Sequence, residues 1–209
     1  MPGPLPIAVL HLDESCLGNG QPGDRPGGAG GLVETRTARG VERRDFFLHA
    51  PATTNNRMAL AGAIAALQLL GQKGNRLRLV IVSDSEYLVK GIREWAPGWQ
   101  RRGWTRKGGA IENLPLWQAL WQSLPNHEAQ FTWVRGHAGH PKNEYANDLA
   151  VKAATEQVTS QGIVASEFAP WLAARQARGQ FAGYDPDLAF DRLADRLAAG
   201  ERFALAEVS

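Results

Sequence analysis

Cysteine is nearly absent from this chain, because Cys16 is the only one among 209 residues. A single cysteine excludes an intrachain disulfide framework and a zinc site built from several thiolates. Long apolar runs are also lacking, since the longest, over residues 58–70, is shorter than the roughly 20 residues that a membrane span needs. The first residues lack the basic segment that begins a signal peptide. We therefore expect a protein of the reducing cytoplasm that does not bind membranes.

A strong overall charge is missing too, because the formal net charge is only +2. Residues 1–154 nevertheless carry 18 Lys and Arg against 13 Asp and Glu, whereas residues 155–209 carry 5 against 8. Within the first part, residues 90–107 hold six basic side chains, one acidic side chain and three tryptophans. Basic charge combined with aromatic rings is typical of a surface that binds a nucleic-acid backbone. A solvated helix whose tryptophans pack inward is the other interpretation.

The chain does have the composition of an average globular protein, with 44% hydrophobic and 21% charged residues. The residue pattern predicts strands over residues 5–13, 31–37, 41–49, 77–83 and 129–135. It predicts helices over residues 54–70, 85–95, 113–123, 142–157, 167–178 and 185–199, and a loop over the glycine-rich residues 18–31. Three strands before the first long helix indicate an antiparallel meander, and the later alternation indicates parallel strands. We therefore predict an α/β fold with a mixed sheet flanked by helices.

Two aspartates follow predicted strands. Asp13 lies at the end of the first strand, and Asp84 follows the apolar run of residues 79–83. The carboxyl ends of neighbouring strands meet at one edge of an open α/β sheet, and two carboxylates placed there repel each other unless a cation lies between them. Oxygen ligands favour Mg²⁺ or Mn²⁺. Either aspartate could instead cap the turn or helix that follows it.

Two histidines, His137 and His140, lie in the loop Gly-His-Ala-Gly-His-Pro. A histidine between glycines can accept and release a proton near neutral pH. An exposed loop residue without a chemical role is the plainer interpretation of either one.

Four separated motifs together resemble those of bacterial type 1 ribonuclease H, in the same order and with similar spacing. They are Asp-Glu-Ser-Cys-Leu-Gly-Asn at 13–19, Thr-Thr-Asn-Asn-Arg-Met at 53–58, Ser-Asp-Ser-Glu-Tyr at 83–87, and Trp-Val-Arg-Gly-His-Ala-Gly-His-Pro at 133–141 followed by Asn-Glu at 143–144. Residues 91–104 are similar to the basic protrusion of that family. The resemblance covers residues 5–157. It implies a ribonuclease H domain over residues 1–157 and leaves residues 158–209 as a helical C-terminal extension.

The resemblance implies a ribonuclease H-like fold with a five-stranded mixed sheet whose first three strands are antiparallel. It also implies endonucleolytic hydrolysis of the RNA strand of RNA–DNA hybrids with two Mg²⁺ ions, for which Mn²⁺ could substitute. One ion would activate water and the other would stabilise the leaving 3′ oxygen. Asp13 would bridge both ions, Asp84 would bind one, and His137 would shuttle a proton or assist product release. We expect a monomer that acts on the hybrid.

Contacts with the hybrid are also implied by the resemblance, because such a site must read the 2′-hydroxyls that distinguish RNA from DNA. The implied contacts are Asn19, in the glycine-rich loop, and Thr54, Asn55 and Asn56, at the start of the first long helix. Glu86 is a further contact, at a position where glutamine is common in the family. Those from the basic protrusion are Trp99, Arg101, Arg102, Trp104, Arg106 and Lys107.

Two of the family's four metal-binding carboxylates are replaced in this chain. The glutamate that follows Asn-Arg-Met is Ala59, and the aspartate four residues after the motif asparagine is Asn147. Asn147 still offers an uncharged carbonyl oxygen, whereas Ala59 offers no ligand. Asp148 is adjacent but turned by about 100° along the helix. Glu14 replaces a glycine of the family and, on an alternating strand, points away from Asp13 unless the strand has ended.

These replacements predict a ribonuclease H with impaired catalysis. Three accounts remain open: a nuclease disabled on purpose, a natural non-catalytic module that binds RNA–DNA hybrids, or an enzyme in which Glu14, Glu144 or Asp148 substitutes. In the third account the activity is altered but present. Another nuclease of the wider superfamily, such as a resolvase, is less favoured, because Asn55, Asn56 and the protrusion argue against it.

Overall fold

The computed structural model describes residues 4–18, 25–136 and 138–206, and every structural statement below concerns these residues. Its centre is a six-stranded sheet in the order β5-β4-β1-β2-β3-β6. The strands are β1 (Ile7–Cys16), β2 (Arg25–Thr37), β3 (Gly40–Thr53), β4 (Arg78–Ser83), β5 (Glu128–Trp133) and β6 (Val164–Ala165). β1, β2 and β3 pair antiparallel, whereas β4 is parallel to β1 and to β5. The predicted mixed sheet with three antiparallel first strands is confirmed.

The sheet has one strand more than the five that were predicted. β6 comes from the C-terminal extension and pairs with β3 at Arg44 and Asp45. A strand of two residues is too short to show an alternating pattern, so no periodicity could predict it.

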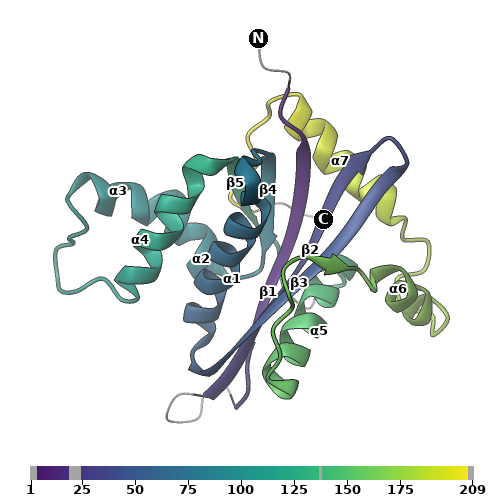
Figure 1. Cartoon of the computed structure of the whole chain (residues 1–209), viewed down its shortest axis with the longest axis horizontal. Coiled ribbons are helices and arrows are strands. Elements are labelled where there is room, and N and C mark those ends of the chain that lie inside the picture. The colour runs from purple at the N-terminus through teal and green to yellow at the C-terminus, as the bar shows by residue number, and fades with distance from the viewer. Residues whose placement is uncertain (1–3, 19–24, 137, 207–209) are drawn as a thin grey trace.

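Helices cover both faces of the sheet (Figure 1). They are α1 (Asn55–Leu70), α2 (Glu86–Lys90), α3 (Ala96–Arg101), α4 (Leu114–Ser123), α5 (Pro141–Glu156), α6 (Phe168–Gln176) and α7 (Pro186–Ala198). A π-helical turn (Gly91–Trp95) joins α2 to α3, so the helix predicted over residues 85–95 continues to Arg101. The largest core lies between the sheet and the helices α1, α2 and α4, whereas α5 and α7 pack on the opposite face. The α3–α4 region projects from the body of the molecule (Figure 1).

The expectation of a loop over residues 18–31 is wrong for residues 25–31, which form the first half of β2. The glycines there allow α5 to pack closely on the sheet. A Cβ added at Gly28 would lie 2.2 Å from the Ala150 carbonyl oxygen, and one at Gly30 would lie 2.5 Å from the Ala146 carbonyl oxygen. The glycines therefore serve a close helix–sheet contact rather than a turn.

The C-terminal extension reaches both edges of the sheet. β6 lies beside β3 at one edge, and at the other edge the Trp133 backbone NH donates to the Leu205 carbonyl at 2.8 Å. Between these contacts α7 buries Phe190 and Leu197 against the valines of β1 and β4. Covering both edges satisfies backbone groups that would otherwise be open to pairing with another chain. None of the helices within the described ranges is long and apolar enough to cross a membrane.

Candidate active site

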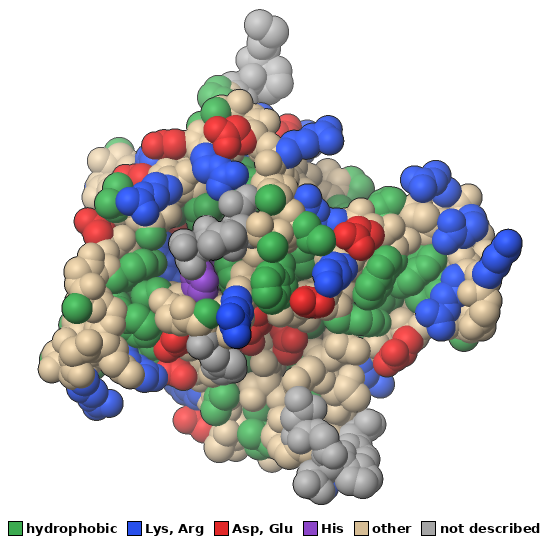
Figure 2. Space-filling view, turned by 180° about the vertical axis from the view of Figure 1, so that it is seen from behind, with side chains coloured by type: hydrophobic (Ala, Val, Ile, Leu, Met, Phe, Trp, Pro, Cys, Tyr) green, Lys and Arg blue, Asp and Glu red, His purple; other side chains and the backbone are tan. Residues whose placement is uncertain are grey.

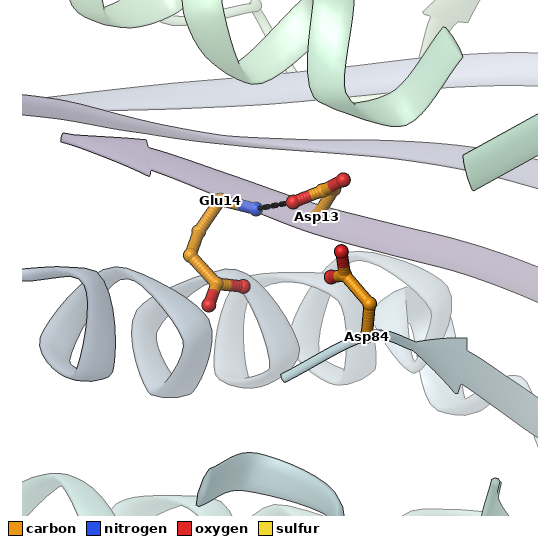
Figure 3. A group of neighbouring side chains, drawn as sticks. All are labelled: Asp13, Glu14 and Asp84. Carbon is orange, nitrogen blue, oxygen red and sulfur yellow. Dashed lines mark hydrogen bonds between the residues drawn. The ribbon is translucent and has the colours of Figure 1, made fainter. Parts of the chain in front are cut away.

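Asp13 and Asp84 meet at the point where β4 ends. The last registered pair of the parallel strands β1 and β4 is Leu12 with Ser83, so Asp84 leaves β4 beside the continuing β1. Carboxylate oxygens of Asp13, Glu14 and Asp84 all lie within 4.8 Å of one another (Figure 3). The structure thus brings together the two aspartates that the sequence placed at this edge, and a third carboxylate joins them.

Glu14 reaches this cluster although β1 extends beyond it. Its side chain leaves the strand on the side opposite to Asp13, as alternation requires (Figure 3). β4 ends at Ser83, which pairs with Leu12 of β1. No described strand therefore lies beside Asp13 and Glu14 at the β4 edge of β1. Both side chains can therefore turn around the open edge toward Asp84. The expected direction of Glu14, opposite to Asp13, is therefore confirmed, and its carboxylate still reaches the cluster.

The cluster is electrostatically strained in the metal-free protein. Burial, and then the nearby charges of Asp84 and Glu14, raise the pKa of Asp13 to about 9. Burial, and then the charge of Asp84, raise the pKa of Glu14 to about 8. The three carboxylates therefore do not all ionise at neutral pH unless a cation offsets their repulsion.

The residues present fit a divalent cation. Glu14 Oε2 is buried and has no hydrogen-bond partner among the described residues. A buried acceptor left without a partner costs about 1–3 kcal/mol, so an ion or an ordered water is expected beside it. The converging groups are carboxylate oxygens, which are the ligands preferred by Mg²⁺ and Mn²⁺.

Neighbouring groups fix the orientation of the two aspartates. The Glu14 backbone NH donates to Asp13 Oδ1 at 2.6 Å, and Asn143 Nδ2 donates to Asp13 Oδ2 at 3.1 Å. The Trp133 indole Nε1 donates to the Asp84 backbone carbonyl at 2.8 Å. Asn143 belongs to one of the four motifs, but its sequence position alone predicted no role for it. The signal that could have found it is its place in the first turn of a helix that packs over the glycines of β2.

The two positions where carboxylates were expected lie on different helices. Ala59 is fully buried on α1, in the core between α1 and the sheet. Asn147 is half-buried on α5, one turn after Asn143 and on the same helix face. Asp148 accepts a hydrogen bond from Arg175 of α6 at 3.0 Å. Its expected direction, away from the cluster, is confirmed.

Two of the predicted site residues, Asn19 and His137, lie outside the described residues. Thr54 is exposed, and its side chain caps the N-terminus of α1. Asn55 and Asn56 are half-buried in the first turn of α1, and Asn55 Oδ1 is a buried acceptor without a partner in the described part of the chain. The expected hybrid contacts of α1 therefore lie together at one helix end.

The basic protrusion, residues 90–107, presents most of its cations to solvent, whereas the Arg93 guanidinium donates to the carbonyls of Phe131, Phe203 and Ala204. Figure 2 shows lysine and arginine side chains gathered over the projecting end of the molecule. The exposed basic residues at the tip are Arg101, Arg102, Arg106 and Lys107. Glu86, at the start of α2, is exposed and pairs with Lys90 at 2.7 Å. These residues remain available to a large ligand.

The tryptophans of the basic protrusion are less available than its cations. Trp99 is 9% exposed and packs against Trp95 and Trp117, with ring centroids 6.0 and 5.7 Å away. Trp104 is half-buried against Trp121. Trp99 therefore packs inward, as the alternative interpretation of this segment expected. The charged side chains at the tip remain exposed to solvent.

The sequence and the fold are matched by known proteins. The RNase H family model matches residues 7–155. The chain is 39% identical to the "Ribonuclease H" of Methylococcus capsulatus, over 77% of this chain and 97% of that protein. It is 43% identical to the "Ribonuclease H" of Pseudomonas paraeruginosa, over 71% of this chain and 93% of that protein.

A solved structure is similar over a longer stretch, which includes part of the C-terminal extension. The crystal structure of "LC9-RNase H1, a type 1 RNase H with the type 2 active-site motif" superposes with a TM-score of 0.81 at 48% identity. The match covers 89% of this chain and 90% of that one. The family model, the sequence relatives and this fold agree, and the chain belongs to the RNase H family of endoribonucleases.

Proposed function

We propose that this chain hydrolyses the RNA strand of RNA–DNA hybrids endonucleolytically, with two divalent metal ions held by Asp13, Glu14 and Asp84. The convergence of these three carboxylates within 4.8 Å is the observation that carries the proposal. Membership of the RNase H family supports the reaction class. The relative described as a type 1 RNase H with the type 2 active-site motif supports an altered set of catalytic carboxylates on this fold.

Glu14 compensates for the carboxylate that is missing at Ala59. A Cβ added at Gly62 of α1 would lie 3.1 Å from Leu12 Cδ1, so Leu12 faces α1. Glu14 leaves β1 on the same side, two residues later. Ala59 lies one helical turn before Gly62 on the same helix. The Glu14 carboxylate of β1 therefore supplies the negative charge that a glutamate at the position of Ala59 on α1 provides in the family.

The metal ions, when bound, supply an activated water and stabilise the charge that develops on the leaving oxygen. Asp13, whose carboxylate lies within 4.8 Å of both others, would hold the ions together with Glu14 and Asp84. Asn143 orients its carboxylate, and the uncharged oxygen of Asn147 is available as a weaker ligand. Metal binding is weaker than in a site with an aspartate at position 147, because Asn147 lacks that charge. His137 keeps its proposed role in proton transfer or product release.

Hybrid binding is assigned to the start of α1 and to the basic protrusion. Thr54, Asn55 and Asn56 provide polar groups for the minor groove, and Glu86 stays a proposed contact. The protrusion provides charge for the phosphate backbone. A monomeric state, action in the cytoplasm and the division at residue 157 stay predictions.

A cleavage assay on end-labelled duplexes tests this function. The chain as it stands, with Mg²⁺ and separately with Mn²⁺, should cut the RNA strand of an RNA–DNA hybrid internally and leave duplex DNA intact. Glu144→Ala and Asp148→Ala should cut like the unaltered chain, because neither carboxylate belongs to the cluster. Hybrid binding without cleavage would instead establish a non-catalytic binding module. Equal cutting of duplex DNA would indicate a resolvase-like nuclease.

A further inference from the structure

Within the described residues the Asp13 carboxylate accepts two hydrogen bonds, and one of them comes from α5. Asn143 Nδ2 donates to Asp13 Oδ2 at 3.1 Å, and both residues are at least 95% buried. Asn143 lies in the first turn of α5, whose N-cap residue, His140, makes no capping hydrogen bond through its side chain. No side-chain cap therefore holds this turn, and a neighbouring side chain adds a contact of another kind.

Lys142, the residue before Asn143, provides that contact. Its Nζ donates to Glu34 Oε2 at 2.7 Å and to the Pro186 carbonyl oxygen at 2.9 Å. The side chains of Lys142 and Glu34 are 3% and 0% exposed. Lys142 thus joins the start of α5 to β2 and, at the same time, to the first residue of α7 in the C-terminal extension.

Glu34 links a second cation to the same end of α7. Arg43 of β3 donates through Nε to Glu34 Oε1 at 2.9 Å and through Nη2 to Asp187 Oδ1 at 2.6 Å. Burial raises the pKa of Glu34, but the His11 and Lys142 side chains outweigh burial and leave that pKa below its usual value. Lys142 and Arg43 therefore both bind the buried carboxylate of Glu34 and both contact the start of α7. Of the two, only Lys142 belongs to α5.

We propose that Lys142 is a positioning residue, which transmits the docking of the C-terminal extension to the catalytic carboxylate of Asp13 through Asn143. The proposal rests on the proposed role of Asp13 as a metal ligand. Substitution of a residue that orients a metal ligand typically lowers metal affinity or activity by about 10–100-fold. The extension is then part of the active-site framework rather than a separate appendage.

The first experiment compares Lys142→Met with Arg43→Met in the full chain. Each variant removes one cation from Glu34 and one link to α7, but only Lys142→Met releases α5. The ¹⁵N-edited NMR signal of the Asn143 side-chain amide in the metal-free protein should shift and broaden in Lys142→Met and remain unchanged in Arg43→Met. The Mg²⁺ concentration for half-maximal cleavage should rise about 10-fold in Lys142→Met, with KM for the hybrid within about twofold.

An unchanged Asn143 signal in folded Lys142→Met would overturn the proposal. If that variant does not fold, Glu34→Gln is added to it. The double variant should fold, because the carboxylate that lost its lysine is replaced by an uncharged amide. It still lacks the bridge to Pro186, so it should show the same altered Asn143 signal. Because the NMR measurement uses metal-free protein, it separates a failure of this proposal from a failure of the proposed reaction.

The second experiment alters a residue of the C-terminal extension itself. Asp185 caps α7 by accepting from the backbone NH groups of Asp187 and Leu188 at 2.9 and 3.0 Å. Asp185→Ala should loosen the first turn of α7 and with it the Pro186 carbonyl, whereas Asp185→Asn keeps the cap. We expect an altered Asn143 signal in Asp185→Ala and its recovery in Asp185→Asn. The same signal in all three proteins would show that the extension does not reach the active site.

Discussion

Gly136 lies directly against the carboxylate of Asp84, so that a Cβ added at residue 136 would be 2.1 Å from Asp84 Oδ2. Gly136→Ala should therefore displace Asp84 from Asp13 and Glu14. We expect metal affinity to fall by about 10-fold or more, because ligand geometry is disturbed while the donor atoms remain. Isothermal titration of the metal-free protein with Mn²⁺ measures the change.

Gly62→Ala is the matched control for that substitution. Its added methyl group would meet Ala29 Cβ at 2.8 Å, in the core and not at a carboxylate. It should lower the free energy of unfolding by about 1–3 kcal/mol without changing metal affinity. Equal Mn²⁺ affinities in Gly136→Ala and the unaltered chain would show that Gly136 does not constrain Asp84.

Close packing of α5 on β2 gives a second prediction. The Cβ of Gly30→Ala would lie 2.5 Å from both the Ala146 carbonyl oxygen and Leu149 Cβ, so α5 must shift. We expect a decrease of about 1–3 kcal/mol in the free energy of unfolding, measured by urea denaturation. Gly98→Ala should be nearly neutral, because its Cβ would meet only the end of the Arg102 side chain, at 3.3 Å. A neutral Gly30→Ala would show that α5 does not need this close approach to β2.

The same glycines explain why the fold was only partly predictable from sequence. The long elements were found, because α1 has apolar residues at helical spacing and β4 is an unbroken apolar run, while Thr54, Pro141 and Asp185 mark helix starts. Residues 25–31 were expected to form a loop because they are rich in glycine. Their local sequence does not show that a distant helix, α5, packs closely on them. Two-residue β6 carries no pattern at all.

The raised pKa values of Asp13, about 9, and Glu14, about 8, predict how stability changes with pH. Between about pH 4 and pH 9 the metal-free folded state holds protons that the unfolded chain has released, so stability falls as pH rises through this window. The Tm of the metal-free protein should decrease across it, and saturating Mg²⁺ should reduce the decrease, because the ion favours the charged carboxylates.

Glu14→Gln serves as the control for this pH dependence, because an amide does not titrate. Its metal-free Tm should fall less steeply between about pH 4.5 and pH 8, since one raised carboxyl group has been removed. A slope identical to that of the unaltered chain would mean that Glu14 does not carry the raised pKa.

Hybrid affinity should depend on the exposed cations of the basic protrusion. Replacing Arg101, Arg102, Arg106 and Lys107 with alanine should weaken binding and lower the slope of log affinity against log salt by about one unit for each phosphate that is no longer neutralised. Fluorescence anisotropy at several salt concentrations measures both effects. A variant that lacks four cations elsewhere should keep the slope; its substituted residues are Arg36, Arg39, Arg44 and Arg178. An unchanged slope in the first variant would exclude binding of phosphates by the protrusion.

The candidate site was also only partly predictable from the sequence. Asp13 and Asp84 were found, because strand ends and residue type identify them. Glu14 was named only as one of three possible substitutes, because alternation predicts its face of the strand, whereas its reach to Asp84 depends on where β4 ends. Asn143 was missed as an orienting residue, because its contact with Asp13 spans 130 residues of sequence.

Whether Glu14 replaces the carboxylate missing at Ala59 is decided by the rate of hybrid cleavage in Mg²⁺ by two variants. Glu14→Ala should reduce kcat/KM by about 100-fold or more, and Glu14→Ala with Ala59→Glu should regain at least about 10-fold of that reduction. Cleavage by Glu14→Ala at the rate of the unaltered chain would show that Glu14 does not replace it.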